Sequence, residues 1–299
     1  MNIELAQAWL KSQSLDAYFH YHTDPHQSEY LADHWQVMAW LTGFTGSAGT
    51  VVFTQNGAAL WADSRYYLQA EKQLEGSGIA LMKTGLPGTQ ATDEWLKEQL
   101  PEGGTVGIDP NLISITPYFT TKKSLQAQGF ELTPVLGCVE AVWADRPPLS
   151  TSRVKEHDVL YAGQSREEKL TAVRAKMLKN KADVLLIPTL DDLAWLLNLR
   201  GSDIDFNPVF MSYLLIEADN ATLFVDAAKV PQSIAKDLAS AGVGIRPYNS
   251  VLDAIASIPE ALSIWLDYGR SNYALYQAIP AGRNMVKSAL PTILMKACK

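Results

Sequence analysis

Three short strings recur in the same order in the two halves of the chain, and this internal repeat constrains the fold more than any other feature. In the first half the strings are Asp16-Ala-Tyr-Phe, Ala39-Trp-Leu and Leu60-Trp-Ala-Asp63, and in the second half they are Asp183-Val-Leu-Leu, Ala194-Trp-Leu and Leu223-Phe-Val-Asp226. Ala194 follows Ala39 by 155 residues and Leu223 follows Leu60 by 163 residues, a drift that a few loop residues explain. The repeat indicates two domains of one fold.

Local patterns in the first half predict strands that alternate with helices, which is typical of an α/β layer. The predicted helices cover 3–10, 33–41, 66–74 and 92–100, and the predicted strands cover 15–20, 50–54, 58–62, 79–82 and 105–108. Asn56-Gly57 between two of these strands predicts a hairpin, because both residues accept the positive φ angles of tight turns.

A break in this periodicity comes at 144–152, where two prolines and several polar residues predict a linker. Ser165 and Glu168 have the spacing of a capping box and predict the start of a helix, whose apolar face would contain Leu170, Val173 and Met177.

Charge and composition exclude several classes of partner. The 299 residues carry a net charge of −7 without a basic block, which argues against nucleic acid and anionic membranes as partners. No apolar run approaches the roughly 20 residues of a membrane-spanning helix. Two cysteines, Cys138 and Cys298, and the lack of a basic segment leading into an apolar run at the N-terminus indicate a cytoplasmic protein.

Two glycine-rich patterns carry little functional weight. Gly43-Phe-Thr-Gly46-Ser-Ala-Gly49 does not match G-x-G-x-x-G and precedes a predicted strand, so dense turns explain it better than a phosphate site. Thr45 stands two residues before Ser47, where a nucleophile elbow requires glycine.

Histidines and paired acids are also more consistent with structural roles. His20, His22 and His26 could hold a metal, but no carboxylate pair at ligand spacing completes the shell, and hydrogen-bonded loop histidines are the favoured interpretation. Asp191-Asp192 is interpreted as a helix start, and Asp203 and Asp205 as turn residues beside a glycine loop.

At the position of Arg65 the two copies of the repeat differ in a way that points to function. It lies two residues past Asp63, whereas Ala228 occupies the matching position past Asp226. The duplicated fold therefore does not require Arg65, which makes it a functional candidate. The alternative is an exposed arginine that pairs with a nearby carboxylate.

Several strings together resemble one family. They are Asp24-Pro-His-Gln-Ser-Glu-Tyr30, Ser47-Ala-Gly-Thr50, Trp61-Ala-Asp-Ser-Arg-Tyr66, Leu81-Met-Lys83, Asn198-Leu-Arg-Gly-Ser-Asp203 and Asn207-Pro208. The chain resembles, over nearly its whole length, the N-terminal part of the cytosolic three-domain Xaa-Pro aminopeptidases (aminopeptidase P). The resemblance implies two creatinase N-terminal-type α/β domains, each a mixed sheet with flanking helices.

The resemblance also implies a domain plan. Domain I is expected over 1–143, a linker over 144–164, domain II over 165–290, and the start of a junction over 291–299. In the family, a C-terminal pita-bread domain binds two divalent metal ions, manganese or zinc, through two Asp, one His and two Glu, and uses them for hydrolysis. This chain stops before that domain, so no catalytic or metal-ligating residue is assigned here, and the chain alone is expected to be inactive and to bind no cofactor.

Residue by residue, the resemblance implies a substrate-binding role for Arg65, which matches the arginine of the family's W-T-D-G-R-Y-F string. A guanidinium suits this role because it stays charged and offers fixed donors to carbonyls and carboxylates. Ser64 departs from the glycine of that string. His26, Gln27, Glu29 and Tyr30 are expected to form a structural or inter-domain cluster near the mouth of the active site.

The leading hypothesis is therefore the non-catalytic N-terminal region of an Xaa-Pro aminopeptidase, which releases the residue preceding proline from peptides. This region would shape substrate access, contact its own catalytic domain and support a homodimer. The alternative is a standalone peptide-binding or dimerisation module. Creatine hydrolysis or dipeptide cleavage is a third possibility, against which the double domain argues.

Overall fold

The computed structural model describes residues 2–297, which form two compact units. The first unit contains the chain up to Pro25 and Asp33–Pro148. The second contains His26–Ala32 and the chain from Leu149 onward. A short stretch of the N-terminal half, which we call the strap (His26–Ala32), therefore packs as part of the second unit.

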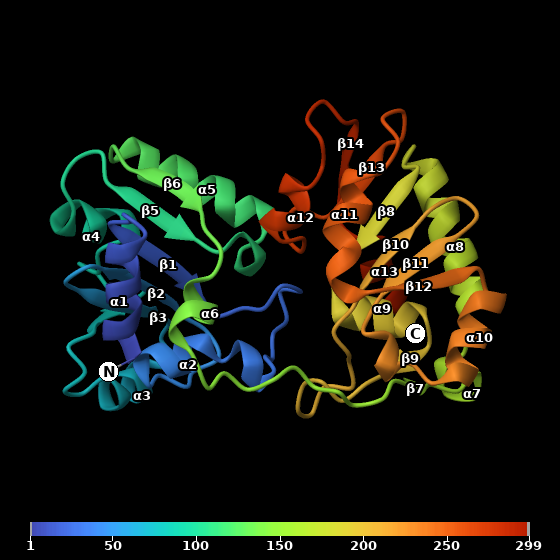
Figure 1. Ribbon diagram of the computed structural model, residues 1–299, viewed down its shortest axis with the longest axis horizontal. Coiled ribbons are helices and arrows are strands. Elements are labelled where there is room, and N and C mark those ends of the chain that lie inside the picture. Colours follow the sequence, from blue (N-terminus) through green and yellow to red (C-terminus); the bar gives the residue numbers. More distant parts are fainter. Residues whose placement is uncertain (1, 298–299) are drawn as a thin grey trace. The chain divides into compact units, whose positions relative to one another are not determined.

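The first unit is built on a six-stranded mixed sheet of order β4-β3-β2-β1-β5-β6 (Figure 1). Its strands are β1 (Ala17–Tyr21), β2 (Thr50–Thr54), β3 (Ala58–Ala62), β4 (Ala80–Lys83), β5 (Thr105–Ile108) and β6 (Glu131–Pro134). Its helices are α1 (Asn2–Ser12), η1 (Asp33–Trp35), α2 (Val37–Thr42), α3 (Tyr67–Gln73), α4 (Thr92–Gln99), η2 (Pro110–Leu112), α5 (Ile115–Ala127) and α6 (Cys138–Val142), where η marks a 3-10 helix.

The second unit is built on another six-stranded sheet, of order β12-β11-β10-β8-β13-β14. Its strands are β8 (Val184–Ile187), β10 (Tyr213–Ile216), β11 (Ala221–Phe224), β12 (Val243–Arg246), β13 (Ile264–Leu266) and β14 (Met285–Lys287), with β7 (Lys155–Glu156) and β9 (Leu199–Arg200) paired separately. Its helices are α7 (Val159–Ala162), α8 (Arg166–Lys179), α9 (Leu190–Leu196), η3 (Ala227–Lys229), α10 (Gln232–Ser240), η4 (Tyr248–Ser250), α11 (Val251–Ala256), α12 (Tyr273–Gln277) and α13 (Thr292–Ala297).

The two sheets have the same topology, strand for strand. In the first, β1 is antiparallel to β2 and parallel to β5, β2 is antiparallel to β3, and the outer pairs are parallel. In the second, β8 is antiparallel to β10 and parallel to β13, β10 is antiparallel to β11, and the outer pairs are again parallel. The duplication inferred from the repeated strings is therefore confirmed at the level of the sheet, and so is the mixed α/β class.

The central strands β3 and β8 are buried on both faces, which is typical of sheets that have helices on both sides. Every residue of β3 and β8 is buried, so these strands show continuous apolar runs instead of an alternating pattern. In the first unit the core joins α1 to this layer, where the rings of Trp9 and Tyr18 meet edge to face with centroids 5.6 Å apart.

The hairpin between β2 and β3 forms as predicted, but for a different reason. Neither Asn56 nor Gly57 has a positive φ angle. Instead, the hydroxyl oxygen of Thr54 accepts hydrogen bonds from the amides of Asn56 at 3.3 Å and Gly57 at 3.0 Å. A side-chain turn therefore replaces the expected left-handed one.

Helix starts follow their capping signals closely. The hydroxyl of Ser165 accepts from the amide of Glu168, and the Glu168 carboxylate accepts from the amide of Ser165, which confirms the predicted capping box of α8.

The single helix expected over 33–41 is instead split into η1 and α2. Of the predicted junction 291–299, α13 is described, whereas Cys298 and Lys299 lie outside the described residues.

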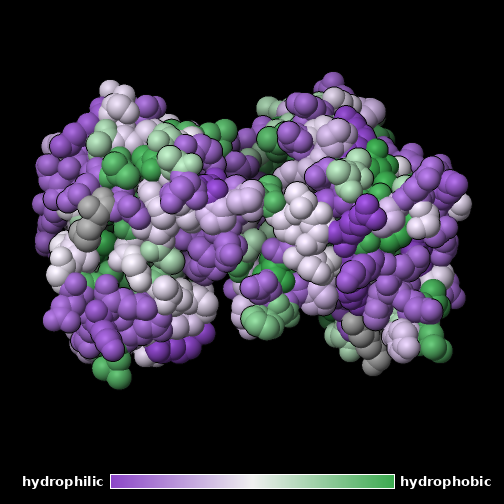
Figure 2. All heavy atoms as spheres, turned by 60° about the horizontal axis from the view of Figure 1, so that its bottom comes forward, coloured by the Kyte–Doolittle hydropathy of each residue, from purple (hydrophilic) through white to green (hydrophobic). Residues whose placement is uncertain are grey.

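The surface carries mostly hydrophilic residues on the face drawn in Figure 2, with hydrophobic residues in small separate areas. Within residues 2–297, no helix has both the length and the apolar character that crossing a membrane would demand.

Candidate functional site

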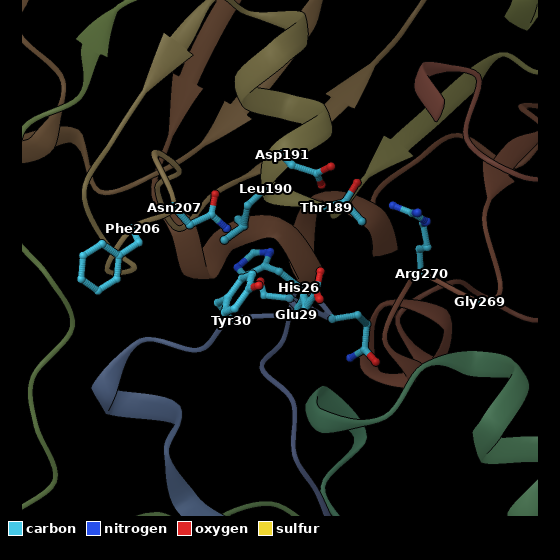
Figure 3. A pocket seen from close by; sticks show the side chains of 12 residues that line it. His26, Glu29, Tyr30, Thr189, Leu190, Asp191, Phe206, Asn207, Gly269 and Arg270 are labelled. Carbon is cyan, nitrogen blue, oxygen red and sulfur yellow. The ribbon is translucent and has the colours of Figure 1, made fainter. Parts of the chain in front are cut away.

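A pocket of about 580 Å³ lies in the second unit, where two neighbouring parallel strands end. Thr189, Leu190 and Asp191 line it directly after β8, and Gly269 and Arg270 line it shortly after β13. Carboxyl ends of adjacent parallel strands meet at one edge of a sheet, and ligands of α/β proteins bind in the crevice outside that edge. The strap closes one side of this pocket through residues 26–30, and the loop residues Phe206 and Asn207 close another (Figure 3).

His26 fastens the strap to the second unit. Its Nδ1 lies 2.7 Å from the carbonyl oxygen of Pro188 and its Nε2 lies 2.8 Å from the hydroxyl of Tyr248. A carbonyl oxygen can only accept, so Nδ1 is the nitrogen that donates to Pro188, and Nε2 pairs with the hydroxyl of Tyr248. The imidazole also packs on the ring of Tyr213 at a centroid distance of 4.4 Å and is 1% exposed.

Of the other strap residues named from sequence, Gln27, Glu29 and Tyr30 line the same pocket. Gln27 has a positive φ angle of 56°, and Tyr30 is 57% exposed. The structure therefore brings all four predicted cluster residues to one pocket of the second unit, with His26 in its wall and Glu29 and Tyr30 open to solvent.

A buried carboxylate lies behind the pocket. Asp192 is fully buried, and its Oδ2 accepts a hydrogen bond of 2.6 Å from the hydroxyl of Thr189. Lys296 of α13 lies 2.9 Å from Oδ1 and also pairs with Asp191, whereas Nη1 of Arg270 approaches Oδ2 only to 3.5 Å. Asp191 and Asp192 both lie in the first turn of α9, as predicted, and Asp192 in addition holds α13 in place.

The Asn198-Leu-Arg-Gly-Ser-Asp203 string builds the loop beside the pocket. Asn198 has a φ angle of +53°, and its side-chain oxygen accepts from the buried ammonium of Lys169 at 2.6 Å. Gly201 has no room for a side chain, because a Cβ atom there would lie 2.5 Å from Cβ of Phe210. The string is thus explained by backbone geometry.

Asp203 lies in a loop, as its sequence context predicts, but it is also a buried anchor of that loop. It is 7% exposed, its Oδ2 accepts from the amide of Met211 at 2.8 Å, and it forms a buried ion pair with Lys229. Both side chains are buried, so water cannot stabilise either charge alone. The ion pair therefore anchors the base of the loop.

Phe206 lies in this loop with an unfavourable backbone conformation and an exposed aromatic ring. Its φ angle is +61°, and its side chain is fully exposed at a relative accessibility of 106%. A bulky residue with positive φ costs of order 1 kcal/mol or more, and here no packing within the unit compensates for it.

Arg65 belongs to the first unit and lies outside this pocket. Its Nε and Nη2 donate to the two carboxylate oxygens of Asp63 at 3.0 and 2.7 Å, and its guanidinium lies 5.2 Å from the ring centroid of Tyr66. The bidentate contact with Arg65 lowers the pKa of Asp63. The Arg65 side chain remains 65% exposed, so it is oriented and still accessible.

Buried titratable groups lie near the ends of β1 and β5 in the first unit. Burial lowers the pKa of His20 to about 3, with smaller contributions from His22 and Arg146. Burial raises the pKa of Asp109 to about 6, although Asp109 accepts a hydrogen bond from the amide of Asn111. Residues 2–297 contain no group of three or more His, Cys, Asp and Glu side chains arranged to hold a metal ion.

Phe206 and Arg270 line the pocket and were not predicted as site residues from the sequence, and neither was the burial of Asp192. A signal existed for Arg270, since Asp267-Tyr-Gly-Arg270 follows the apolar run Ile264-Trp-Leu266 as a polar turn would follow a buried strand. No sequence signal distinguishes Phe206 from a core phenylalanine.

Family models match nearly the whole chain. One model, the creatinase/prolidase N-terminal domain, matches residues 3–142, and a second model of the same description matches residues 145–299. The two matched ranges correspond to the two copies of the sheet.

Several similar proteins are aminopeptidases. Xaa-Pro aminopeptidase ApepP of Drosophila melanogaster is 38% identical over 96% of this chain and 48% of its own length, and aminopeptidase P2 of Arabidopsis thaliana is 42% identical over 82% of this chain and 35% of its own. The X-prolyl aminopeptidase of Caenorhabditis elegans, described as a cytosolic enzyme with a di-nuclear active site, is 34% identical and superposes with a TM-score of 0.87 over 92% of this chain and 46% of its own. The chain thus spans about half the length, or less, of these relatives.

Proposed function

Because the chain belongs to the creatinase/prolidase N-terminal domain family, we propose that it is the non-catalytic N-terminal region of an Xaa-Pro aminopeptidase. The observation that carries the proposal is the similarity to the Caenorhabditis elegans enzyme across both units at a TM-score of 0.87. The parent protein would release the residue that precedes proline from the N-terminus of peptides, in the cytoplasm.

In this proposal the chemistry belongs to a catalytic domain that would follow this chain. Two divalent metal ions, manganese or zinc, would bind there, and none of the residues of this chain would be a ligand. The two N-terminal domains would contact that domain, limit the access of substrates and support a homodimer.

Arg65 is the residue of this chain that we expect to bind the peptide. Asp63 orients its guanidinium through two hydrogen bonds and leaves 65% of the side chain accessible. A guanidinium held in this way stays charged and accessible, and it can bind peptide carbonyls or a terminal carboxylate without a large entropic cost. The second domain has Ala228 at the matching position, which supports a role for Arg65 outside the shared fold.

The experiment compares Arg65→Ala with the parent in the complete protein, using a tripeptide with proline in the second position. We expect kcat/KM to fall at least about tenfold, which corresponds to one lost charge-assisted hydrogen bond in the transition state. Arg246→Ala is the matched control, because Arg246 is also exposed and lies over an aromatic ring, Phe224.

Two outcomes would count against the proposal in different ways. An unchanged kcat/KM in Arg65→Ala would remove the role of Arg65. A complete protein that does not cleave Xaa-Pro peptides with manganese or zinc would remove the parent activity and favour the alternative, a standalone peptide-binding or dimerisation module.

A further inference from the structure

We propose that the pocket of the second unit binds the carboxylate end of a short peptide, with Arg270 as the group that receives the carboxylate. This inference does not require Xaa-Pro cleavage. It rests on the accessible donors of Arg270, on the elongated set of lining residues and on the strained loop that presents Phe206.

Arg270 is the cation of the pocket whose charge is least engaged. Its contact with Asp192 is long, at 3.5 Å, and within residues 2–297 its guanidinium makes no shorter ion pair or hydrogen bond. Asp192 does not depend on it, because Lys296 and Thr189 already bind that carboxylate at 2.9 and 2.6 Å. The Arg270 side chain is 42% exposed, so most of its five N–H donors are free to bind a ligand.

The shape of the pocket suits an extended ligand. In Figure 3, Arg270 and Phe206 lie at opposite ends of the group of lining side chains, and His26, Glu29 and Tyr30 lie between them. The volume of about 580 Å³ is within the range of small-molecule sites. A peptide of a few residues could therefore place its carboxylate at Arg270 and its preceding residues along Tyr30 and Asn207 toward Phe206.

The acidic residues of the pocket select the charge of the ligand. Asp191 is neutralised by Lys296, but Glu29 is exposed and adds a negative charge to the same pocket. A phosphate dianion would be repelled by Glu29, whereas a carboxylate carries one charge and matches the planar fork of a guanidinium. A peptide ammonium is also compatible with Glu29.

The strained loop supports a binding role for its tip. Asp203, paired with Lys229, and Gly201, packed against Phe210, fix the base of the loop, so the positive φ angle of Phe206 persists. Backbone strain of this kind concentrates at ligand sites, and exposed aromatic side chains are frequent binding anchors. Phe206 is placed to contact an apolar side chain of the peptide.

The test is calorimetric titration of the chain with the tripeptide Ala-Ala-Phe and with its C-terminal amide. We expect the free acid to bind one site with a Kd of about 1 mM or tighter, and the amide to bind at least about tenfold more weakly. Arg270→Gln should weaken binding of the acid by the same factor and leave the amide unaffected. Arg246→Gln, at an exposed arginine outside the pocket, should leave both affinities unchanged.

Three results would overturn the proposal. They are no heat of binding up to about 10 mM peptide, equal affinity for acid and amide, and an Arg270→Gln variant that binds the acid as the parent does. Thermal unfolding of Arg270→Gln confirms that the variant is folded, and Phe206→Ser, a fully exposed position, provides a second variant that should weaken both ligands without loss of stability.

Discussion

Nδ1 of His26 lies 2.7 Å from the carbonyl oxygen of Pro188, a residue 162 positions further along the chain. The strap follows β1 of the first sheet but packs as part of the second unit, and this hydrogen bond is one of the contacts that hold it there. Pro188 is the first residue after β8, so the bond also places the strap at the edge of the second sheet where the pocket forms.

His26→Ala should destabilise the second unit. The substitution removes both hydrogen bonds and leaves the carbonyl of Pro188 without this donor, at an expected cost of about 2–4 kcal/mol in the free energy of unfolding. Urea unfolding measures the loss. Tyr30→Ala on the same strap is the control, because Tyr30 is exposed and should change the value by less than about 0.5 kcal/mol. Equal effects of the two variants would show that His26 does not anchor the strap.

Asp109→Asn should stabilise the protein at neutral pH. Burial raises the pKa of Asp109 from 3.8 to about 6, so the folded state favours the protonated carboxyl. The contribution of Asp109 to stability is therefore largest below about pH 4 and is lost as the pH rises through about 6, by on the order of 2–3 kcal/mol. Asparagine removes this loss and keeps an oxygen that can accept from the amide of Asn111.

The free energy of unfolding of Asp109→Asn, measured by urea at pH 3.5 and pH 7, should exceed that of the parent only at pH 7. Asp226→Asn is the matched control: Asp226 caps η3 as Asp109 caps η2, but it is exposed. A similar gain in both variants, or a gain at both pH values, would contradict the prediction.

Lys229→Met should destabilise the loop beside the pocket. It leaves the buried carboxylate of Asp203 without its counter-charge, and breaking such a pair costs about 3–5 kcal/mol. Lys83→Met is the control, since the Lys83–Glu71 pair is partly exposed, at 32% and 47% of the two side chains, and should contribute about 0–1 kcal/mol. Thermal unfolding compares the two, and a small shift for Lys229→Met would mean that water reaches Asp203.

Much of the fold could be predicted from sequence where a local signal and the tertiary structure agree. The strands β2 and β3 have the predicted bounds, because their apolar runs flank a polar turn, and α8 begins at its capping box. In contrast, β6 and α5 were not predicted. Only one of the four residues of β6 is buried, and α5 contains Pro117 and few apolar positions, so neither has a clear period.

The candidate site was only partly predictable, because its parts come from distant segments. Glu29 and Tyr30 were named from a string, but nothing local indicates that the strap would pair with Pro188. The exposure and strain of Phe206 depend on how Gly201 and Asp203 pack, which requires the tertiary structure.

The central claim is that this chain is the N-terminal region of an Xaa-Pro aminopeptidase, and the reading frame beyond the codon for Lys299 tests it most directly. We expect the source transcript to continue in frame into a domain with two Asp, one His and two Glu placed to bind two metal ions. A stop codon directly after Lys299 would contradict the claim and leave a standalone binding module.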